Sequence, residues 1–125
     1  MSIAYTYVLT DGAQAQLLAP TTETASGNTA AVAIQPAKGD ALAILNVGTP
    51  TGTSPTLSAQ LESSPDGTTW TAVGAPLAPA AAGIYSVAFR PNDATGTQFR
   101  WALTLGGTSP SFPLSSELIY WPAKN

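Results

Sequence analysis

This sequence of 125 residues contains no histidine and no cysteine, and charged residues are scarce in it. Without cysteine there is no disulfide framework, no cysteine-based zinc site and no thiol nucleophile. Without histidine, the commonest general base and the commonest transition-metal ligand are missing. Only four residues are cationic, so the chain has no basic footprint for nucleic acid. These absences predict a structural or binding protein that uses no cofactor, rather than an enzyme.

Long apolar runs are also missing. No stretch approaches the roughly 18 apolar residues of a membrane span, and the first residues lack the basic and apolar regions of a secretory signal. We therefore expect a protein that is made in a cytoplasm and has no membrane partner. Only 9% of the residues are charged, against about 25% in a typical soluble domain. This deficit indicates that other protein covers much of the surface in the working state; the alternative is a lightly charged monomer.

Apolar residues recur with period two and nowhere with the period of an amphipathic helix. Residues 56–63 show the pattern clearly, since Leu57, Ala59 and Leu61 face one way and polar side chains the other. Residues 41–47 are apolar almost throughout, as expected for a central strand covered on both faces. In all we expect about eight strands, at residues 3–9, 29–35, 41–47, 56–63, 69–73, 84–90, 98–105 and 114–121.

Turn residues separate these strands at intervals of about 8–12 residues. Residues 64–67, Ser-Pro-Asp-Gly, are a strong example, because Pro presets its φ and Gly tolerates a positive one. The pattern predicts an all-β single domain, an antiparallel β-sandwich or jelly roll. Within it, residues 1–28 are expected to form an N-terminal strand or arm with a long polar loop over 11–28. Residues 29–125 are expected to form the β-sandwich core.

One short sequence occurs twice. Residues 52–57 read Gly-Thr-Ser-Pro-Thr-Leu, and residues 107–112 read Gly-Thr-Ser-Pro-Ser-Phe. Each copy follows an apolar strand and precedes an alternating one, so we predict two similar hairpins with both turns at one end of the sandwich. A duplicated sugar-binding loop is the alternative interpretation.

The acidic residues do not form a recognisable catalytic or metal site. A glycosidase needs two carboxyl groups facing each other across a cleft, and Glu62 and Glu117 are the candidate pair if their hairpins are adjacent. The alternation of their strands instead predicts solvent-facing positions for both. Asp66 alone, or Asn92 with Asp93, supplies too few oxygens for calcium. Serine has no histidine to activate it and no Gly-x-Ser-x-Gly elbow.

Most aromatic side chains are predicted to fill the core, where each buries a large area. We expect Asp66 to cap its turn and Trp70, just after it, to dock its ring on the core. The full set of predicted core aromatics is Trp70, Phe89, Phe99, Trp101, Phe112 and Tyr120.

Over about residues 45–120 the chain resembles small β-sandwich virion proteins of tailed bacteriophages, of the capsid decoration or cement type. The resemblance is carried by the runs Asn46-Val47-Gly48-Thr49, Thr53-Ser54-Pro55-Thr56-Leu57, Leu61-Glu62-Ser63-Ser64, Pro65-Asp66-Gly67-Thr68-Thr69-Trp70, Gln98-Phe99-Arg100-Trp101 and Gly107-Thr108-Ser109-Pro110-Ser111-Phe112. It implies a protein that sits on the capsid as a dimer or trimer and strengthens the joints between capsomers.

The resemblance and the low charge together predict a structural virion protein on the outer capsid surface. Its partner would be the major capsid protein, and it would bind as a homo-oligomer. Ile3, Tyr5, Tyr7 and Trp121 lie near the termini, where core positions are scarce, and are the predicted contacts with another subunit or the capsid. Two alternatives stay open. One is a carbohydrate-binding module of a tail or fibre protein, with Tyr5, Tyr7 and Trp121 as the candidates for stacking on sugars. The other is a different minor head or tail component.

Overall fold

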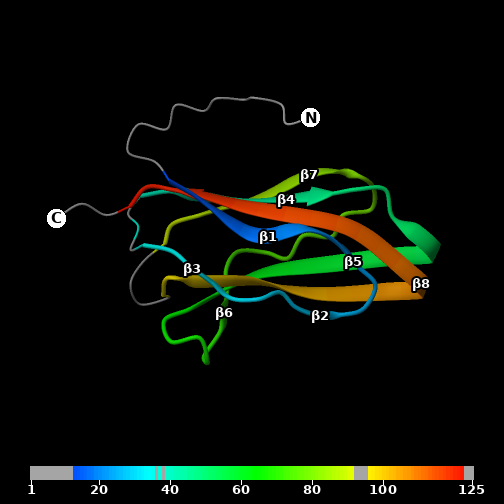
Figure 1. The fold of residues 1–125 in the computed structure, drawn as a ribbon, viewed down its shortest axis with the longest axis horizontal. Coiled ribbons are helices and arrows are strands. Elements are labelled where there is room, and N and C mark those ends of the chain that lie inside the picture. The colour runs from blue at the N-terminus through cyan, green and yellow to red at the C-terminus, as the bar shows by residue number, and fades with distance from the viewer. Residues whose placement is uncertain (1–12, 36, 38, 92–95, 123–125) are drawn as a thin grey trace.

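The computed structural model describes residues 13–35, 37, 39–91 and 96–122, and every regular element among them is a β-strand (Figure 1). Because no described residue is helical, none belongs to a helix that could cross a membrane. All strand pairings are antiparallel, which confirms the predicted fold class. The strands are β1 (Ala13–Glu23), β2 (Gly27–Asn28), β3 (Val32–Ala33), β4 (Ala41–Val47), β5 (Thr51–Ser64), β6 (Thr71–Ala72), β7 (Gly83–Phe89) and β8 (Gln98–Tyr120).

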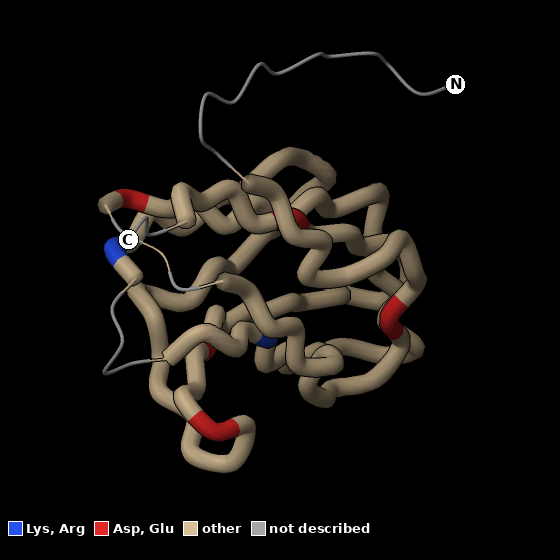
Figure 2. The backbone as a smooth tube through the Cα atoms, turned by 60° about the vertical axis from the view of Figure 1, so that its left-hand side comes forward, with Lys and Arg blue, Asp and Glu red and all other residues tan. Residues whose placement is uncertain are grey.

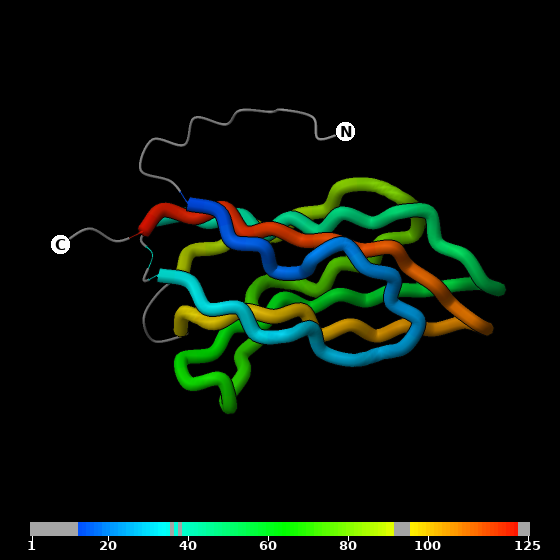
Figure 3. Tube along the Cα trace, viewed as in Figure 1, coloured from blue at the N-terminus to red at the C-terminus, as the bar shows by residue number. Residues whose placement is uncertain are grey.

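The strands form two layers, which we call the β4 sheet and the β5 sheet (Figures 1 and 3). In the β4 sheet the order is β1, residues 112–120 of β8, β4 and β7. In the β5 sheet, β2 and β3 lie beside residues 98–106 of β8, followed by β5 and β6. The long strand β8 thus belongs to both sheets, and Figure 3 shows it passing from one layer to the other around one end of the molecule.

The repeated Gly-Thr-Ser-Pro segments form this corner. They are not the turns of two separate hairpins, as the sequence predicted, because they lie inside β5 and β8 and pair with each other, with Thr53 opposite Thr108. Register shifts on both sides of Thr53 mark bulges, which bend a strand without ending it. For the same reason the two strands predicted at 98–105 and 114–121 are one continuous strand.

The two sheets are built alike around the corner. In the β4 sheet Leu45 lies opposite Ser116, and in the β5 sheet Trp101 lies opposite Leu61. The strand pairing therefore has an approximate twofold symmetry. In it, β4 corresponds to residues 98–106 of β8, and β5 corresponds to residues 112–120 of β8. The neighbouring pairs correspond in the same order, Ala43–Leu118 and Val47–Leu114 matching Phe99–Ser63 and Leu103–Ala59.

The core lies between the two sheets, and one side-chain network crosses it. Trp101, on the β5 sheet, is fully buried, and its indole N–H donates to Ser116 Oγ on the β4 sheet at 2.7 Å. Ser116 Oγ in turn donates to the carbonyl of Ile44 at 2.6 Å. The one polar group that Trp101 brings into the core is thus satisfied, and the two layers are joined by hydrogen bonds as well as by packing.

Most of the predicted core aromatics occupy the core. Phe99, Phe112 and Tyr120 are buried together with Trp101. Phe89 packs against the core from its edge, with its ring 5.5 Å from that of Phe99. The prediction for Trp70 is wrong, because this side chain is not part of the core.

The N-terminal part of the described chain differs most from expectation. Within the loop predicted over residues 11–28, β1 is a strand of 11 residues paired with β8. Two register shifts along β1 break the period-two pattern, so the alternation that identifies other strands is obscured there. The strand predicted at 29–35 is reduced to the short strand β3, and that at 69–73 to β6, while β2 falls within the predicted loop. The strand predicted at 3–9 falls outside the described residues.

Candidate interaction surface

The described residues hold no cluster of three or more His, Cys, Asp or Glu side chains that could bind a metal ion. Glu62 and Glu117, the candidate carboxylate pair, are not brought together. Glu62 lies in the β5 sheet and Glu117 in the β4 sheet, and each alternates with buried neighbours, so each faces outward. The two carboxylates therefore flank no common cleft, and the surfaces on which they lie become the candidate functional regions.

On the outer face of the β5 sheet, charge is paired. Arg100 Nε lies 2.8 Å from Glu62 Oε1, and only about a fifth of each side chain is exposed (22% and 20%). The guanidinium carbon of Arg100 also lies 4.1 Å from the centroid of the Trp70 ring, which is a cation–π geometry. The Trp70 indole N–H donates to the carbonyl of Gly67 at 3.2 Å. Trp70 therefore covers an ion pair on the surface, which explains why it is absent from the core.

The turn that positions Trp70 is organised by Asp66, as the sequence predicted. Asp66 Oδ1 accepts the backbone N–H groups of Thr68 and Thr69 at 2.8 and 2.9 Å, and the Ser64 hydroxyl at 3.0 Å. These hydrogen bonds, that from Thr69 first, stabilise the ionised form and hold the pKa of Asp66 below its ordinary value of 3.8. These hydrogen-bond partners of the carboxylate all lie within two or three residues of Asp66, so its role is to stabilise the turn.

The outer face of the β4 sheet is different in character. Its central strands present Leu42, Ile44 and Ile119, each half-buried between buried neighbours, and the edge strand β7 presents Ile84, which is 77% exposed. The face carries one carboxylate at its centre, Glu117, which accepts a hydrogen bond from Gln14 Nε2. Figure 2 shows that charged residues are few along the described backbone.

The approximate symmetry of the two sheets allows their outer faces to be compared position by position. In the β5 sheet Glu62 lies opposite Arg100, and in the β4 sheet Glu117 lies at the equivalent place opposite Ile44. An isoleucine thus stands where the related position of the other sheet holds the cation of an ion pair. The outer face of the β4 sheet thus presents Leu42, Ile44 and Ile119 with no cation opposite Glu117, beside uncharged polar side chains such as Asn46 and Ser115. An apolar group on an outer sheet face is a candidate contact with another protein.

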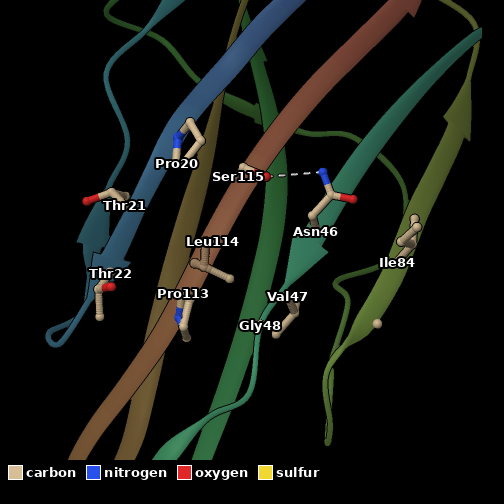
Figure 4. A pocket seen from close by; sticks show the side chains of 11 residues that line it. Pro20, Thr21, Thr22, Asn46, Val47, Gly48, Ile84, Pro113, Leu114 and Ser115 are labelled. Carbon is tan, nitrogen blue, oxygen red and sulfur yellow. Dashed lines mark hydrogen bonds between the residues drawn. The ribbon is translucent and has the colours of Figure 1, made fainter. Parts of the chain in front are cut away.

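An open hollow of about 600 Å³ continues this face toward the corner of the sandwich (Figure 4). It crosses β1, β8, β4 and β7, and none of its lining residues is charged; they include Pro20, Thr22, Asn46, Gly48, Ile84 and Pro113. Gly48 donates its N–H to the Pro113 carbonyl at 2.8 Å, and a Cβ at Gly48 would lie 2.8 Å from Pro113 Cβ. Gly48 and Pro113, which both line the hollow, therefore approach this closely because Gly48 has no side chain. With only amide and hydroxyl groups at its rim, such as Asn46 bound to Ser115, the hollow suits a neutral, largely apolar group.

Of the four predicted contact residues, the structure describes Trp121. Ile3, Tyr5 and Tyr7 lie outside the described residues, and Trp121 follows β8 with 37% of its surface exposed. Sequence reasoning missed Leu42 and Ile44, although a signal was present. The apolar run 41–47 predicted a strand covered on both faces, whereas the described chain buries only the face that carries Ala43 and Leu45.

No protein-family model matches the sequence, and no curated protein sequence is similar to it. Among solved structures, the fold is similar to a chain of the Bacillus endospore appendages, a family of disulfide-linked pili, with a TM-score of 0.49 and 19% identity over 90% of this chain and 89% of that one. It is also similar to a chain of infectious bursal disease virus, strain Gx, with a TM-score of 0.50 and 13% identity over 91% of this chain and 34% of that one. This chain thus spans about a third of the viral chain, and at these identities the likeness concerns the fold.

Proposed function

We propose that this protein is a structural virion protein of the decoration or cement type, which binds the outer surface of a capsid as a homo-oligomer. Its partner is the major capsid protein, and the outer face of the β4 sheet is its contact surface. The observation that carries the proposal is the replacement of a cation by Ile44 opposite Glu117, where the other sheet keeps the Arg100–Glu62 ion pair. The likeness in fold to a chain of infectious bursal disease virus is compatible with this role.

The mechanism is mechanical. Each copy contributes a modest apolar contact through Leu42, Ile44, Ile84 and Ile119, with few charges to desolvate. Copies that act together add their contacts, because the second and later contacts of an oligomer form at high effective concentration. Protein bound across a joint between capsomers stabilises the assembled state relative to the separated one, by an amount that grows with the ratio of its free concentration to its Kd.

The test is co-sedimentation of the purified full chain with capsids that lack it. In Ile44→Arg, the new guanidinium lies opposite Glu117 as Arg100 lies opposite Glu62, so the variant is expected to fold. Docking would then have to desolvate an ion pair, and we expect capsid affinity to fall at least tenfold, or about 1.4 kcal/mol. Thr104→Arg adds the same charge to the exposed outer face of the β5 sheet and should bind like the wild type.

Each part of the proposal can fail by itself. A wild-type chain that does not sediment with any capsid contradicts the virion role. If Ile44→Arg and Thr104→Arg both bind as the wild type does, the contact face has been misplaced. Binding to glycans in place of capsids would favour a carbohydrate-binding role.

A further inference from the structure

Strand β7 has a free edge that lacks the usual protection against pairing. Among the described residues it pairs with β4 alone, in unbroken register over all seven residues, and its sequence Gly-Ile-Tyr-Ser-Val-Ala-Phe contains no charge and no proline. Native edges are normally blunted by charged side chains, proline or bulges, since exposed N–H and C=O groups recruit further strands. The opposite edge of the same sheet is protected in this way, because β1 carries Pro20 and two register shifts.

The chain also contains a segment suited to that edge. Residues 3–9, Ile-Ala-Tyr-Thr-Tyr-Val-Leu, alternate large apolar and smaller side chains, carry no charge and match β7 in length. Aromatic and β-branched residues with this alternation favour an extended strand that packs by one face. We propose that residues 3–9 of a second copy add to the free edge of β7 as a fifth strand of the β4 sheet. This inference rests on the proposed homo-oligomer and names its contact.

The chain between residues 3–9 and β1 is too short for residues 3–9 to pair with β7 of the same copy. Residues 1–12 lead into β1 at Ala13, and β1 and β7 are the two opposite edges of the β4 sheet. A strand beside β7 would lie four strand spacings from β1, about 19 Å. The stretch from Leu9 to Ala13 spans at most about 14 Å even when fully extended. A segment paired as far as Leu9 therefore cannot belong to the chain whose β7 it covers.

Addition of this strand would satisfy the open backbone groups of β7 and enlarge the apolar face. Ile84, Ser86 and Ala88 are the exposed side chains of β7 on the outer side, and a neighbouring strand would place its own side chains beside them. Donor and acceptor occupy different parts of the molecule. Copies can then exchange segments reciprocally in a dimer or pass them around a closed ring such as a trimer.

The test uses the absence of natural cysteine in the full chain. One chain carries Ser86→Cys, at the middle of β7, as an activated mixed disulfide. A second chain carries Tyr5→Cys or Thr6→Cys, which point to opposite faces of an extended segment. We expect thiol exchange to give a covalent heterodimer with at least one of the two, at least tenfold faster than with a partner activated at Thr104→Cys. Equal rates for the Ser86 and Thr104 positions would overturn the proposal.

A double variant separates exchange between copies from folding back within one chain. With Ser86→Cys and the reactive member of Tyr5→Cys or Thr6→Cys in the same chain, oxidation should give covalent dimers or larger species. A cross-linked monomer as the only product would overturn the assignment to a second copy.

The oligomeric state gives a second, independent measurement. Light scattering on the wild-type chain should show a dimer or ring, and Ser86→Lys, which places a charge on the edge, should weaken its association at least tenfold. Thr104→Lys, with the same charge on the other sheet, should assemble normally. Unchanged assembly of Ser86→Lys would contradict the proposal. None of these experiments contains a capsid, so a chain that exchanges segments but never binds capsids fails only the proposed function.

Discussion

Gly52 and Gly107 each pack against the backbone of the segment that contains the other. A Cβ at Gly52 would lie 2.5 Å from the Ser109 carbonyl oxygen, and a Cβ at Gly107 would lie 2.5 Å from that of Ser54. Their φ angles are +115° and +100°, and the two serines also have positive φ. The corner of the sandwich is therefore a reciprocal contact between the two Gly-Thr-Ser-Pro segments.

This contact predicts that alanine at either glycine is strongly destabilising. Gly52→Ala or Gly107→Ala combines an unfavourable positive φ with a clash against a carbonyl oxygen, and we expect a loss of about 3 kcal/mol in the free energy of unfolding. Gly27→Ala is the control, since Gly27 has an ordinary φ and a Cβ there meets nothing within 4 Å. Urea denaturation of the three variants measures the effect, and equal stability of all three would show that the corner tolerates side chains.

The hydroxyl of Ser116 is predicted to stabilise the core. Ser116→Ala would leave the Trp101 indole N–H without its acceptor and remove the hydrogen bond to the Ile44 carbonyl. Because unsatisfied buried polar groups are costly, we expect a loss of about 2–3 kcal/mol.

Ser63→Ala is the matched control for this prediction. The Ser63 hydroxyl is buried and has no hydrogen-bond partner among the described residues. Its replacement should be neutral or stabilising by up to about 1 kcal/mol. Chemical denaturation followed by Trp fluorescence compares the two variants, and a Ser116→Ala variant as stable as Ser63→Ala would contradict the role of the network.

The pKa of Asp66 predicts a specific loss of stability in acid. Because the folded-state pKa lies below the ordinary value of 3.8, the stabilisation is complete above that value and is lost as the pH falls through the folded-state pKa. Asp66→Asn keeps an acceptor oxygen but cannot titrate, so its stability should vary less with pH in this range. Denaturation curves from pH 5 down to about 2 check the difference, and parallel curves for the two proteins would refute it.

The two ion pairs are predicted to differ in strength. Arg100 and Glu62 are largely screened from water and covered by Trp70, whereas Arg90 and Asp40 form a pair with side chains 73% and 80% exposed. Double-mutant cycles should give a coupling of about 1 kcal/mol for the first pair and less than about 0.5 kcal/mol for the second. Raising the salt concentration should abolish the smaller coupling first. A larger coupling for the exposed pair would contradict this ranking.

Much of the fold was accessible from the sequence, because alternation is a property of each strand by itself. Leu57, Ala59 and Leu61 were assigned to one face, and all three are buried. Strand β1 was missed because bulges interrupt its pattern, and Trp70 was misplaced because its partner, Arg100, comes from a distant strand. The candidate contact face could be predicted from the sequence only in part. The apolar character of Leu42 and Ile44 could be read directly, but whether the chain itself covers them could not.

The sequence by itself determined that this protein is built from antiparallel strands and which side chains of most strands turn inward. Both follow from local chain geometry, in which successive side chains point to opposite sides. Only the tertiary structure decided that the two Gly-Thr-Ser-Pro segments pair with each other, and that Ile44 and Arg100 occupy equivalent places. The physical reason is that pairing depends on contacts between residues far apart in the chain. The same glycine and serine residues would satisfy a hairpin turn or a bent strand equally well.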